Sequence, residues 1–254
     1  MKKIAYMLVA LSVSCQATVM PQQSRVIFHP GEVKRSLLLV NNEDAPVLVQ
    51  SWVDLGRPDK KPGEKNFPFV ALPAVFRLNK AEKRVITLIR SAQSASLPAD
   101  RESLYWLNIY EISAVKKNIA QQKLNKFNLA MNTQLKIINR PFRDSYNFRE
   151  RTQKLKFQTQ QMAGKIMLTV INPTPYYFTP GQMNITIGSW QNKVYLGADK
   201  AVAPFSDKAF PLTIHSGVLP AGKATLHFSA IDDDGALQYF TYDLNRQKSL
   251  RFSG

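Results

Sequence analysis

Cysteine is almost absent from this sequence, and Cys15 is the only one among 254 residues. An internal disulfide needs two cysteines, so none supports the fold. The fold must therefore be held by its apolar core alone, and 44% of the residues are hydrophobic. Zinc-finger spacing of cysteines is excluded for the same reason.

Long apolar runs are also missing, except near the N-terminus. Residues 4–13 are apolar apart from one tyrosine and one serine, and they follow two lysines. This pattern is typical of an export signal, and the run is too short to span a bilayer of about 30 Å as a helix. We expect residues 1–17 to be a signal peptide cleaved after Ala17. Two alternatives stay open, namely a buried N-terminal strand and a lipoprotein signal anchored at Cys15, which Ser12 disfavours.

Helical periodicity is not visible over any long stretch, and no internal repeat occurs. Instead, short runs rich in Val, Ile, Leu, Tyr and Phe are separated by clusters of Pro, Gly, Asn and Asp. This pattern is typical of many short strands joined by turns. The strands expected in the first half are residues 25–28, 35–41, 47–53, 74–78, 84–90, 104–112 and 126–139. Those expected in the second half are residues 155–158, 165–171, 183–187, 193–196, 210–214, 225–231 and 237–244.

Seven strands in each half match an immunoglobulin-like sandwich, in which two antiparallel sheets pack face to face. Between the halves, residues 143–154 are rich in charge and poor in large apolar side chains, as is typical of a linker. We predict an all-β chain of two immunoglobulin-like β-sandwich domains, residues 18–142 and 150–248. Residues 232–235, three Asp and one Gly, are expected to form a tight hairpin turn.

Signatures of catalysis are lacking as well. The sequence contains no nucleophile elbow, no metalloprotease helix motif and no glycine-rich phosphate loop. His29, His215 and His227 lie far apart and are expected to be structural side chains. The aspartates at 232–234 lack the spacing of a calcium loop. We expect no catalytic residue, no metal site and no cofactor.

Charge is one-sided, with 34 basic and 18 acidic residues giving +16, and loss of residues 1–17 would leave +14. Such a charge suits nucleic acid, an anionic surface or an acidic protein. The basic residues are scattered, no RNA-binding signature accompanies them, and an exported protein seldom meets nucleic acid. We therefore expect a protein or carboxylate partner, and neither nucleic acid nor a small-molecule substrate.

Seven local sequences, in a fixed order across nearly the whole chain after residue 17, carry a family resemblance. They are SRVIF at 24–28, VQSWVD at 49–54, VFRL at 75–78, LPADRESLYW at 97–106, LKIINRP at 135–141, NPTPY at 172–176 and IDDDG at 231–235. In this set and order, the sequence resembles the periplasmic chaperones of chaperone/usher pilus assembly. It departs from the family at residues 113–115, where prolines are usual, and at Asp232, where Asn is frequent.

The resemblance implies a function and a binding site. Such chaperones stabilise immature pilus subunits in the periplasm by lending them a β-strand, and deliver them to an outer-membrane usher. An arginine and a lysine between the domains anchor the subunit's C-terminal carboxylate, and these correspond to Arg25 and Lys136. Charge-assisted hydrogen bonds of this kind contribute about 1.5 to 3 kcal/mol each. We expect both cations to be solvated in the free protein, so that replacing either one leaves thermal unfolding nearly unchanged.

The strand leading to Lys136 has apolar residues on alternate positions, namely Phe127, Leu129, Met131 and Leu135. Alternation alone predicts a half-buried strand of the protein's own sandwich. The resemblance adds that this stripe fills the groove of a subunit lacking its last strand. Each buried side chain is worth roughly 1.5 to 3 kcal/mol before association costs, so the stripe would dominate affinity. The carboxylate anchor would set the register.

The resemblance also implies an interdomain charge cluster of Glu102, Arg140 and Asp233, which holds the two sandwiches in a boomerang arrangement. Two other functions stay open, namely a secreted β-sandwich binding module and a hydrolase with a dispersed site. The binding module, an adhesin or a carbohydrate-binding domain, would use exposed aromatics at loop tips. The sequence also leaves open whether the free protein pairs with itself to cover an exposed strand edge.

Overall fold

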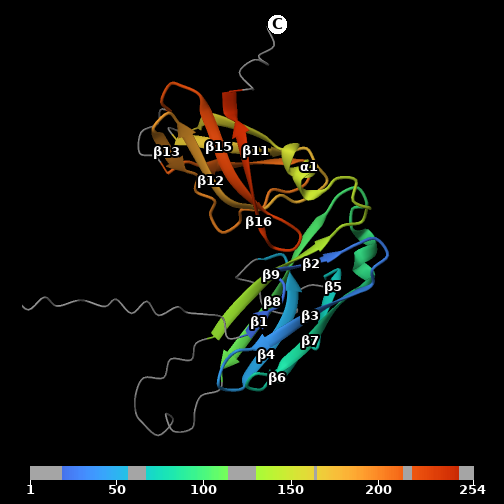
Figure 1. Cartoon of the computed structure of the whole chain (residues 1–254). Helices are drawn as coiled ribbons and strands as arrows, with labels where there is room; N and C mark the ends of the chain where they lie inside the picture. The colour runs from blue at the N-terminus through green and yellow to red at the C-terminus, as the bar shows by residue number, and fades with distance from the viewer. Residues whose placement is uncertain (1–18, 57–66, 114–129, 163–164, 214–218, 246–254) are drawn as a thin grey trace, which may run out of the picture.

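The computed structural model describes residues 19–56, 67–113, 130–162, 165–213 and 219–245, which form two β-sandwiches set at an angle (Figure 1). Each sandwich has its own buried apolar cluster. The predicted all-β fold with two immunoglobulin-like domains is therefore confirmed. The expected signal peptide, residues 1–17, lies outside the described residues.

The first domain packs a four-stranded sheet, in the order β1-β3-β7-β5, against a five-stranded sheet, in the order β2-β9-β8-β4-β6. Alternation drives this packing, because in β3 the side chains of Leu37 and Leu39 are buried while Ser36 is exposed. The strands are β1 (Val19–Pro21), β2 (Arg25–Phe28), β3 (Lys34–Asn41), β4 (Val47–Asp54), β5 (Phe69–Leu72), β6 (Val75–Leu78), β7 (Lys83–Arg90), β8 (Ser103–Ser113) and β9 (Ala130–Asn139). A short 3-10 helix covers Ala92–Ser96.

The second domain packs a three-stranded sheet, β10-β11-β14, against a four-stranded sheet, β13-β12-β15-β16. Phe157 and Phe228 meet in its core, with ring centroids 4.9 Å apart. The strands are β10 (Lys156–Met162), β11 (Lys165–Asn172), β12 (Pro180–Ile187), β13 (Trp190–Lys193), β14 (Ser206–Pro211), β15 (Ala224–Ile231) and β16 (Leu237–Asp243).

Every strand expected from the sequence overlaps a strand of the structure. The sequence does not predict β1 and β5, which are only three and four residues long. Pro68 and Pro73 flank β5, and prolines at such positions indicate turns rather than a strand.

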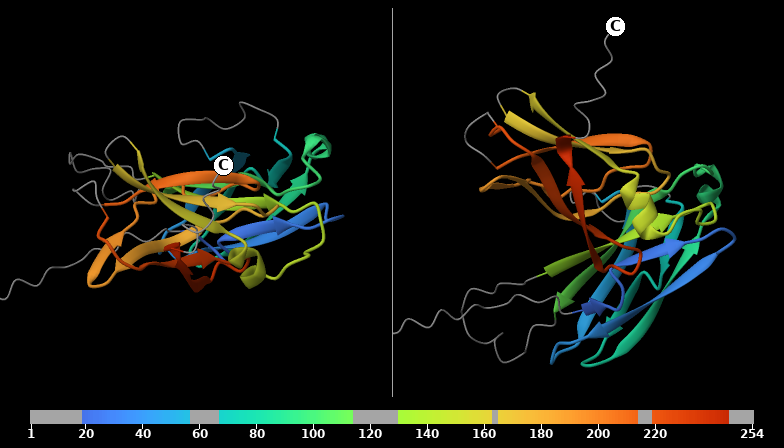
Figure 2. Two further views of the ribbon diagram at one scale, coloured as in Figure 1. Left: turned by 90° about the horizontal axis from the view of Figure 1, so that it is seen from above. Right: turned by 45° about the horizontal axis from the view of Figure 1, so that its top comes forward.

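The charged segment predicted as a linker contains a helix, α1 (Phe148–Gln153). Asn147 and Glu150 form a capping box, in which each side chain accepts a hydrogen bond from the backbone N–H of the other residue. The Phe148 ring lies 6.3 Å from that of Phe240 in β16, so the helix packs onto the second domain. Figure 2 shows α1 beside the junction of the two domains. No helix in the described ranges is long and apolar enough to cross a membrane.

The turn between β15 and β16 reaches the first domain near β2 and β9 (Figure 1). The Gly235 N–H donates to the Asp232 carbonyl at 3.1 Å, and Gly235 has φ +89°, which confirms the predicted turn. A Cβ atom at position 235 would clash with the side chain of Ser24. Glycine is therefore needed both for the turn and for the close approach of the two domains.

Candidate functional site at the edge of β9

Strand β9 has two neighbours along one half and a single neighbour along the other. β8 pairs with it from Ala130 to Asn139, whereas β2 pairs with it only along residues 136–139. Along residues 130–135, the second edge of β9 has no strand partner among the described residues. Unpaired N–H and C=O groups on such an edge are a template for a strand of another chain.

The apolar stripe predicted on this strand is only partly available to a partner. Leu135 is 2% exposed and belongs to the core of the first domain, opposite Leu107 of β8. The prediction for Leu135 is therefore wrong, because the sandwich has already closed around the strand at this residue. Met131 is half-buried on the same side of the strand. Phe127 and Leu129 lie outside the described residues.

Arg25 and Lys136 are directly opposite each other in the parallel pairing of β2 with β9. The Lys136 Nζ donates to the Thr179 hydroxyl at 2.7 Å, and the Arg25 Nη1 donates to the Ile231 carbonyl at 3.3 Å. Both acceptors belong to the second domain and both are neutral. The structure therefore brings the predicted pair together at the junction of the two domains.

The expectation that these cations are solvated is wrong. Arg25 is 8% exposed and Lys136 is 9% exposed, because the second domain covers them. The buried Nε of Arg25 has no hydrogen-bond partner among the described residues. Neither cation forms an ion pair with a carboxylate in the described part of the chain. Burying a positively charged side chain without a paired anion lowers the stability of the free protein.

The pKa values of Arg25 and Lys136 are both lowered by burial. Burial, followed by the charge of Arg25, lowers the pKa of Lys136 from 10.5 to about 7. Burial also lowers the pKa of Arg25, although Asp233 and Asp232 act in the opposite direction. Asp199, which lines the neighbouring cavity, likewise acts to raise the pKa of Lys136. None of these carboxylates bonds to either cation among the described residues, so an anion entering between the two side chains would supply their first direct counter-charge.

A cavity of about 240 Å³ opens beside the two cations, and its lining includes Trp106, Thr179 and Lys200. The Lys136 Nζ lies 5.6 Å from the centroid of the Trp106 ring. A larger hollow of about 870 Å³ also includes Trp106 in its lining, together with Tyr177 of the second domain. The cleft between the domains is thus large enough for the end of a polypeptide chain.

The predicted cluster of Glu102, Arg140 and Asp233 is assembled across the same junction. Arg140 is 1% exposed, its Nε donates to Glu102 at 2.7 Å, and its Nη1 and Nη2 donate to Asp233 at 2.9 and 3.0 Å. Burial lowers the pKa of Arg140, but the bonds to Asp233 and Glu102 outweigh burial and raise it. Glu102 also accepts from the Tyr177 N–H at 2.6 Å.

Two members of this cluster were not predicted. Asp144 accepts two hydrogen bonds from the Arg140 Nη1, at 3.1 and 3.0 Å. Arg151 of α1 donates to Asp233 at 2.6 Å. Both belong to the charged segment predicted as a linker, so the excess of charge there was a signal, but it gave no indication of their partners.

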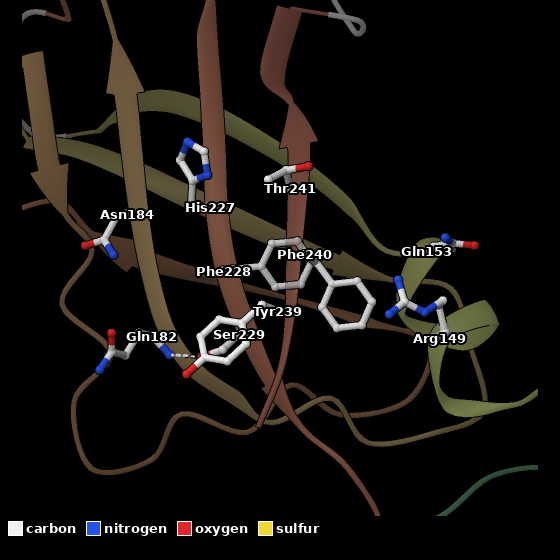
Figure 3. A pocket seen from close by; sticks show the side chains of 10 residues that line it. All are labelled: Arg149, Gln153, Gln182, Asn184, His227, Phe228, Ser229, Tyr239, Phe240 and Thr241. Carbon is white, nitrogen blue, oxygen red and sulfur yellow. Dashed lines mark hydrogen bonds between the residues drawn. The ribbon is translucent and has the colours of Figure 1, made fainter. Parts of the chain in front are cut away.

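A separate hollow of about 430 Å³ lies on the second domain and shares no lining residue with the cation cavity. Figure 3 shows its lining side chains on β12, β15, β16 and α1. Tyr239 is its most exposed aromatic side chain, at 73%. The binding-module alternative expects exposed aromatics at loop tips, whereas Tyr239 lies within β16. Among the described residues, no group of three His, Cys, Asp or Glu is placed to hold a metal ion.

Comparisons with known proteins agree with this architecture. Residues 18–143 match the model of the pili and flagellar-assembly chaperone PapD N-terminal domain, and residues 150–242 match that of the pili assembly chaperone PapD C-terminal domain. The chain is 35% identical over 230 residues to the probable fimbrial chaperone YadV of Escherichia coli K12, covering 89% of each chain.

Solved structures give the same result. The crystal structure of the YadV chaperone matches with a TM-score of 0.73 and 29% identity, over 90% of this chain and 100% of that one. The SafB chaperone of Salmonella enterica, solved in complex with the SafA pilin, matches with a TM-score of 0.68 and 26% identity, over 89% of this chain and 96% of that one. With both domain models matched along its length, the chain belongs to the PapD family of chaperone/usher pilus chaperones.

Proposed function

We propose that this chaperone acts in the periplasm, where it lends β9 to immature pilus subunits as their missing strand. Arg25 and Lys136 bind the subunit's C-terminal carboxylate, and the loaded chaperone delivers the subunit to an outer-membrane usher. The driving force is the unfilled groove of the subunit, so no cofactor or nucleotide takes part. The pilin bound to the related SafB chaperone supports this class of partner.

One observation carries the proposal: the unpaired half of β9 leads directly to two buried cations without a carboxylate partner among the described residues. Six residues of strand, 130–135, span about 20 Å, which is enough for several main-chain hydrogen bonds to an added strand. A subunit strand along this edge would bring its chain end to the cleft, beside Arg25 and Lys136.

The two parts of the site have different tasks. Met131, with Phe127 and Leu129 before it in the sequence, provides apolar side chains at alternate positions. Burial of such side chains contributes most of the binding free energy. The cations fix the register, because a slip of one residue would turn every apolar side chain to the wrong face.

The unpaired edge of β9 also predicts that the free protein associates with a second copy of itself. Analytical ultracentrifugation would detect this dimer.

The anchor is tested by co-expressing the chain with a pilus subunit of the same organism and purifying the complex. The double variant Arg25→Gln/Lys136→Met should fail to retain the subunit. A matched control, Lys156→Met/Lys165→Met, removes two exposed cations of the second domain and should bind normally. Retention of the subunit by the double variant at wild-type levels would show that the carboxylate anchor is wrong.

Strand donation is tested separately by amide hydrogen exchange. Exchange at residues 130–135 should slow when the subunit binds, because the unpaired edge gains main-chain partners. A synthetic peptide with the subunit's C-terminal sequence should bind as the free acid and much more weakly as the amide. Unchanged exchange along β9 in a stable complex would exclude this strand as the donor.

A further inference from the structure

Arg151 joins the interdomain charge cluster but is not among the cluster residues that the family resemblance implies. It lies on α1, is 7% exposed, and donates from Nη2 to Asp233 Oδ1 at 2.6 Å. Its guanidinium carbon is 4.6 Å from the centroid of the Tyr176 ring and 5.0 Å from that of Phe148. The capping box at the start of α1 and the contact of Phe148 with Phe240 fix the helix on the second domain.

Asp233 is shared by two arginines from different parts of the chain. Its Oδ1 accepts from both the Arg151 Nη2 and the Arg140 Nη2, while its Oδ2 accepts from the Arg140 Nη1. The Asp233 side chain is 38% exposed, so its surroundings alone do not restrict it to one rotamer. The bond from Arg151, within the second domain, selects the orientation in which Asp233 offers both oxygens to Arg140 of the first domain.

Charge balance gives Arg151 a second effect. Arg140 contacts three carboxylates, those of Glu102, Asp144 and Asp233. With Arg151 the described cluster has two cations and three anions, whereas without it one cation would be shared among three anions. The three carboxylates would then repel one another with less neutralisation, which would disfavour the approach of Asp233 in the second domain to Glu102 in the first.

The hairpin held by Arg151 also contributes to the anchor. Ile231, two residues before Asp233, accepts the hydrogen bond from Arg25 through its carbonyl. Thr179, which accepts from Lys136, has its carbonyl bonded to the N–H of Ile231 at 3.0 Å. Both neutral partners of the anchor cations are therefore attached to the hairpin whose turn Arg151 restrains.

We propose that Arg151 is a positioning residue of the subunit-binding cleft, acting through Asp233 to fix the angle between the domains and the placement of Arg25 and Lys136. The part concerning subunit capture rests on the proposed function. The part concerning domain angle does not.

The test measures the distance between the domains directly. Nitroxide labels are attached at Ser36→Cys in β3 and Gln158→Cys in β10, and Cys15 is replaced by Ser where residue 15 is retained. Pulsed electron paramagnetic resonance then measures the distance between the two labels. Arg151→Gln should broaden the distance distribution, and Arg151→Lys should restore much of it by retaining the charge. The control Arg149→Gln, on the same helix but over the Phe240 ring, should leave the distribution narrow.

Subunit capture supplies the second readout. The dissociation constant for the subunit should rise about tenfold in Arg151→Gln and recover in Arg151→Lys. Asp233→Asn weakens the bonds from both Arg151 and Arg140, so it should broaden the distances at least as much as Arg151→Gln. Because Arg151 acts through Asp233, the double variant should broaden them no more than Asp233→Asn alone. This second variant keeps the test valid if Arg151→Gln folds poorly.

A distribution in Arg151→Gln as narrow as in the wild type would overturn the proposal. Equal broadening in the Arg149→Gln control would also overturn it, since the effect would then belong to the helix in general. If the wild type itself captures no subunit, the proposed function fails, while the distance measurement still decides the role of Arg151.

Discussion

Lys136 and Arg140 lie four residues apart around the end of β9, and both are buried, but their surroundings are opposite. Arg140 contacts three carboxylates, and its pKa is raised. Lys136 donates to a neutral hydroxyl, and burial lowers its pKa to about 7. A cation neutralised within its own chain serves the fold, whereas a buried cation without a counter-charge is a candidate for binding an anion. This contrast distinguishes Arg140, which joins the two domains, from Lys136, which belongs to the proposed binding site.

The largest expected effect on stability comes from removing Arg140, the cation that is neutralised by carboxylates of its own chain. Arg140→Ala leaves Glu102, which is 3% exposed, as a buried carboxylate without its cation. The free energy of unfolding should fall by about 3 to 5 kcal/mol, as is typical when one partner of a buried ion pair is removed. Urea denaturation measures this loss.

The control for Arg140→Ala is Arg101→Ala, which breaks the exposed pair of Arg101 with Asp100. It should cost less than about 1 kcal/mol. Equal losses in the two variants would mean that the buried cluster has no special part in stability.

The next effect has the opposite sign. Lys136→Met should raise the free energy of unfolding of the free protein by about 3 kcal/mol at pH 6. The gain is the cost of keeping a buried ammonium charged, reduced by the lost bond to Thr179 and the contact with Trp106. The same variant should lose subunit capture. Destabilisation by Lys136→Met, relative to the exposed control Lys156→Met, would contradict this account.

The buried ammonium of Lys136 should also make the free energy of unfolding depend on pH, with a smaller effect than the substitution itself. The pKa of Lys136 is about 7 in the folded state, against 10.5 for a lysine side chain free in water. Between these values the unfolded chain binds more protons, so the cost of Lys136 is full below pH 7 and is relieved as pH rises. The stability gap between Lys136→Met and wild type should narrow by roughly 2 kcal/mol from pH 7 to pH 9. A gap that is constant over this range would mean that Lys136 titrates normally.

The sequence predicts the fold well and the environment of the site poorly, and these residues explain why. Alternation is local, so a strand such as β3 is visible from eight residues. The burial of Lys136 depends on Thr179, which is 43 residues away and in another domain. Arg151 and Asp233 are 82 residues apart, and nothing in the charged segment indicates that contact.

The limits of the apolar stripe could not be predicted for a related reason. Met131 and Leu135 follow the same alternation and lie on the same side of β9. What distinguishes them is the place where the sandwich closes over the strand, and that is set by packing against β8 and the opposite sheet. Motif order did identify Glu102, Arg140 and Asp233 as a set, because the resemblance supplied long-range information that alternation lacks.

The smallest expected effect concerns residues 130–135 of β9, the half of the strand whose second edge has no strand partner among the described residues. Met131 is half-buried in the free chain, so Met131→Ala should change the free energy of unfolding little but weaken subunit binding by about 1 kcal/mol, or roughly fivefold. Asn132→Ala, on the opposite side of the same strand, is the matched control and should leave affinity within about twofold of the wild type. Titration of each variant with a purified subunit measures both. Since an added strand pairs through its main chain, equal weakening by the two substitutions would mean that the side of the strand is irrelevant and that Met131 does not enter the subunit's groove.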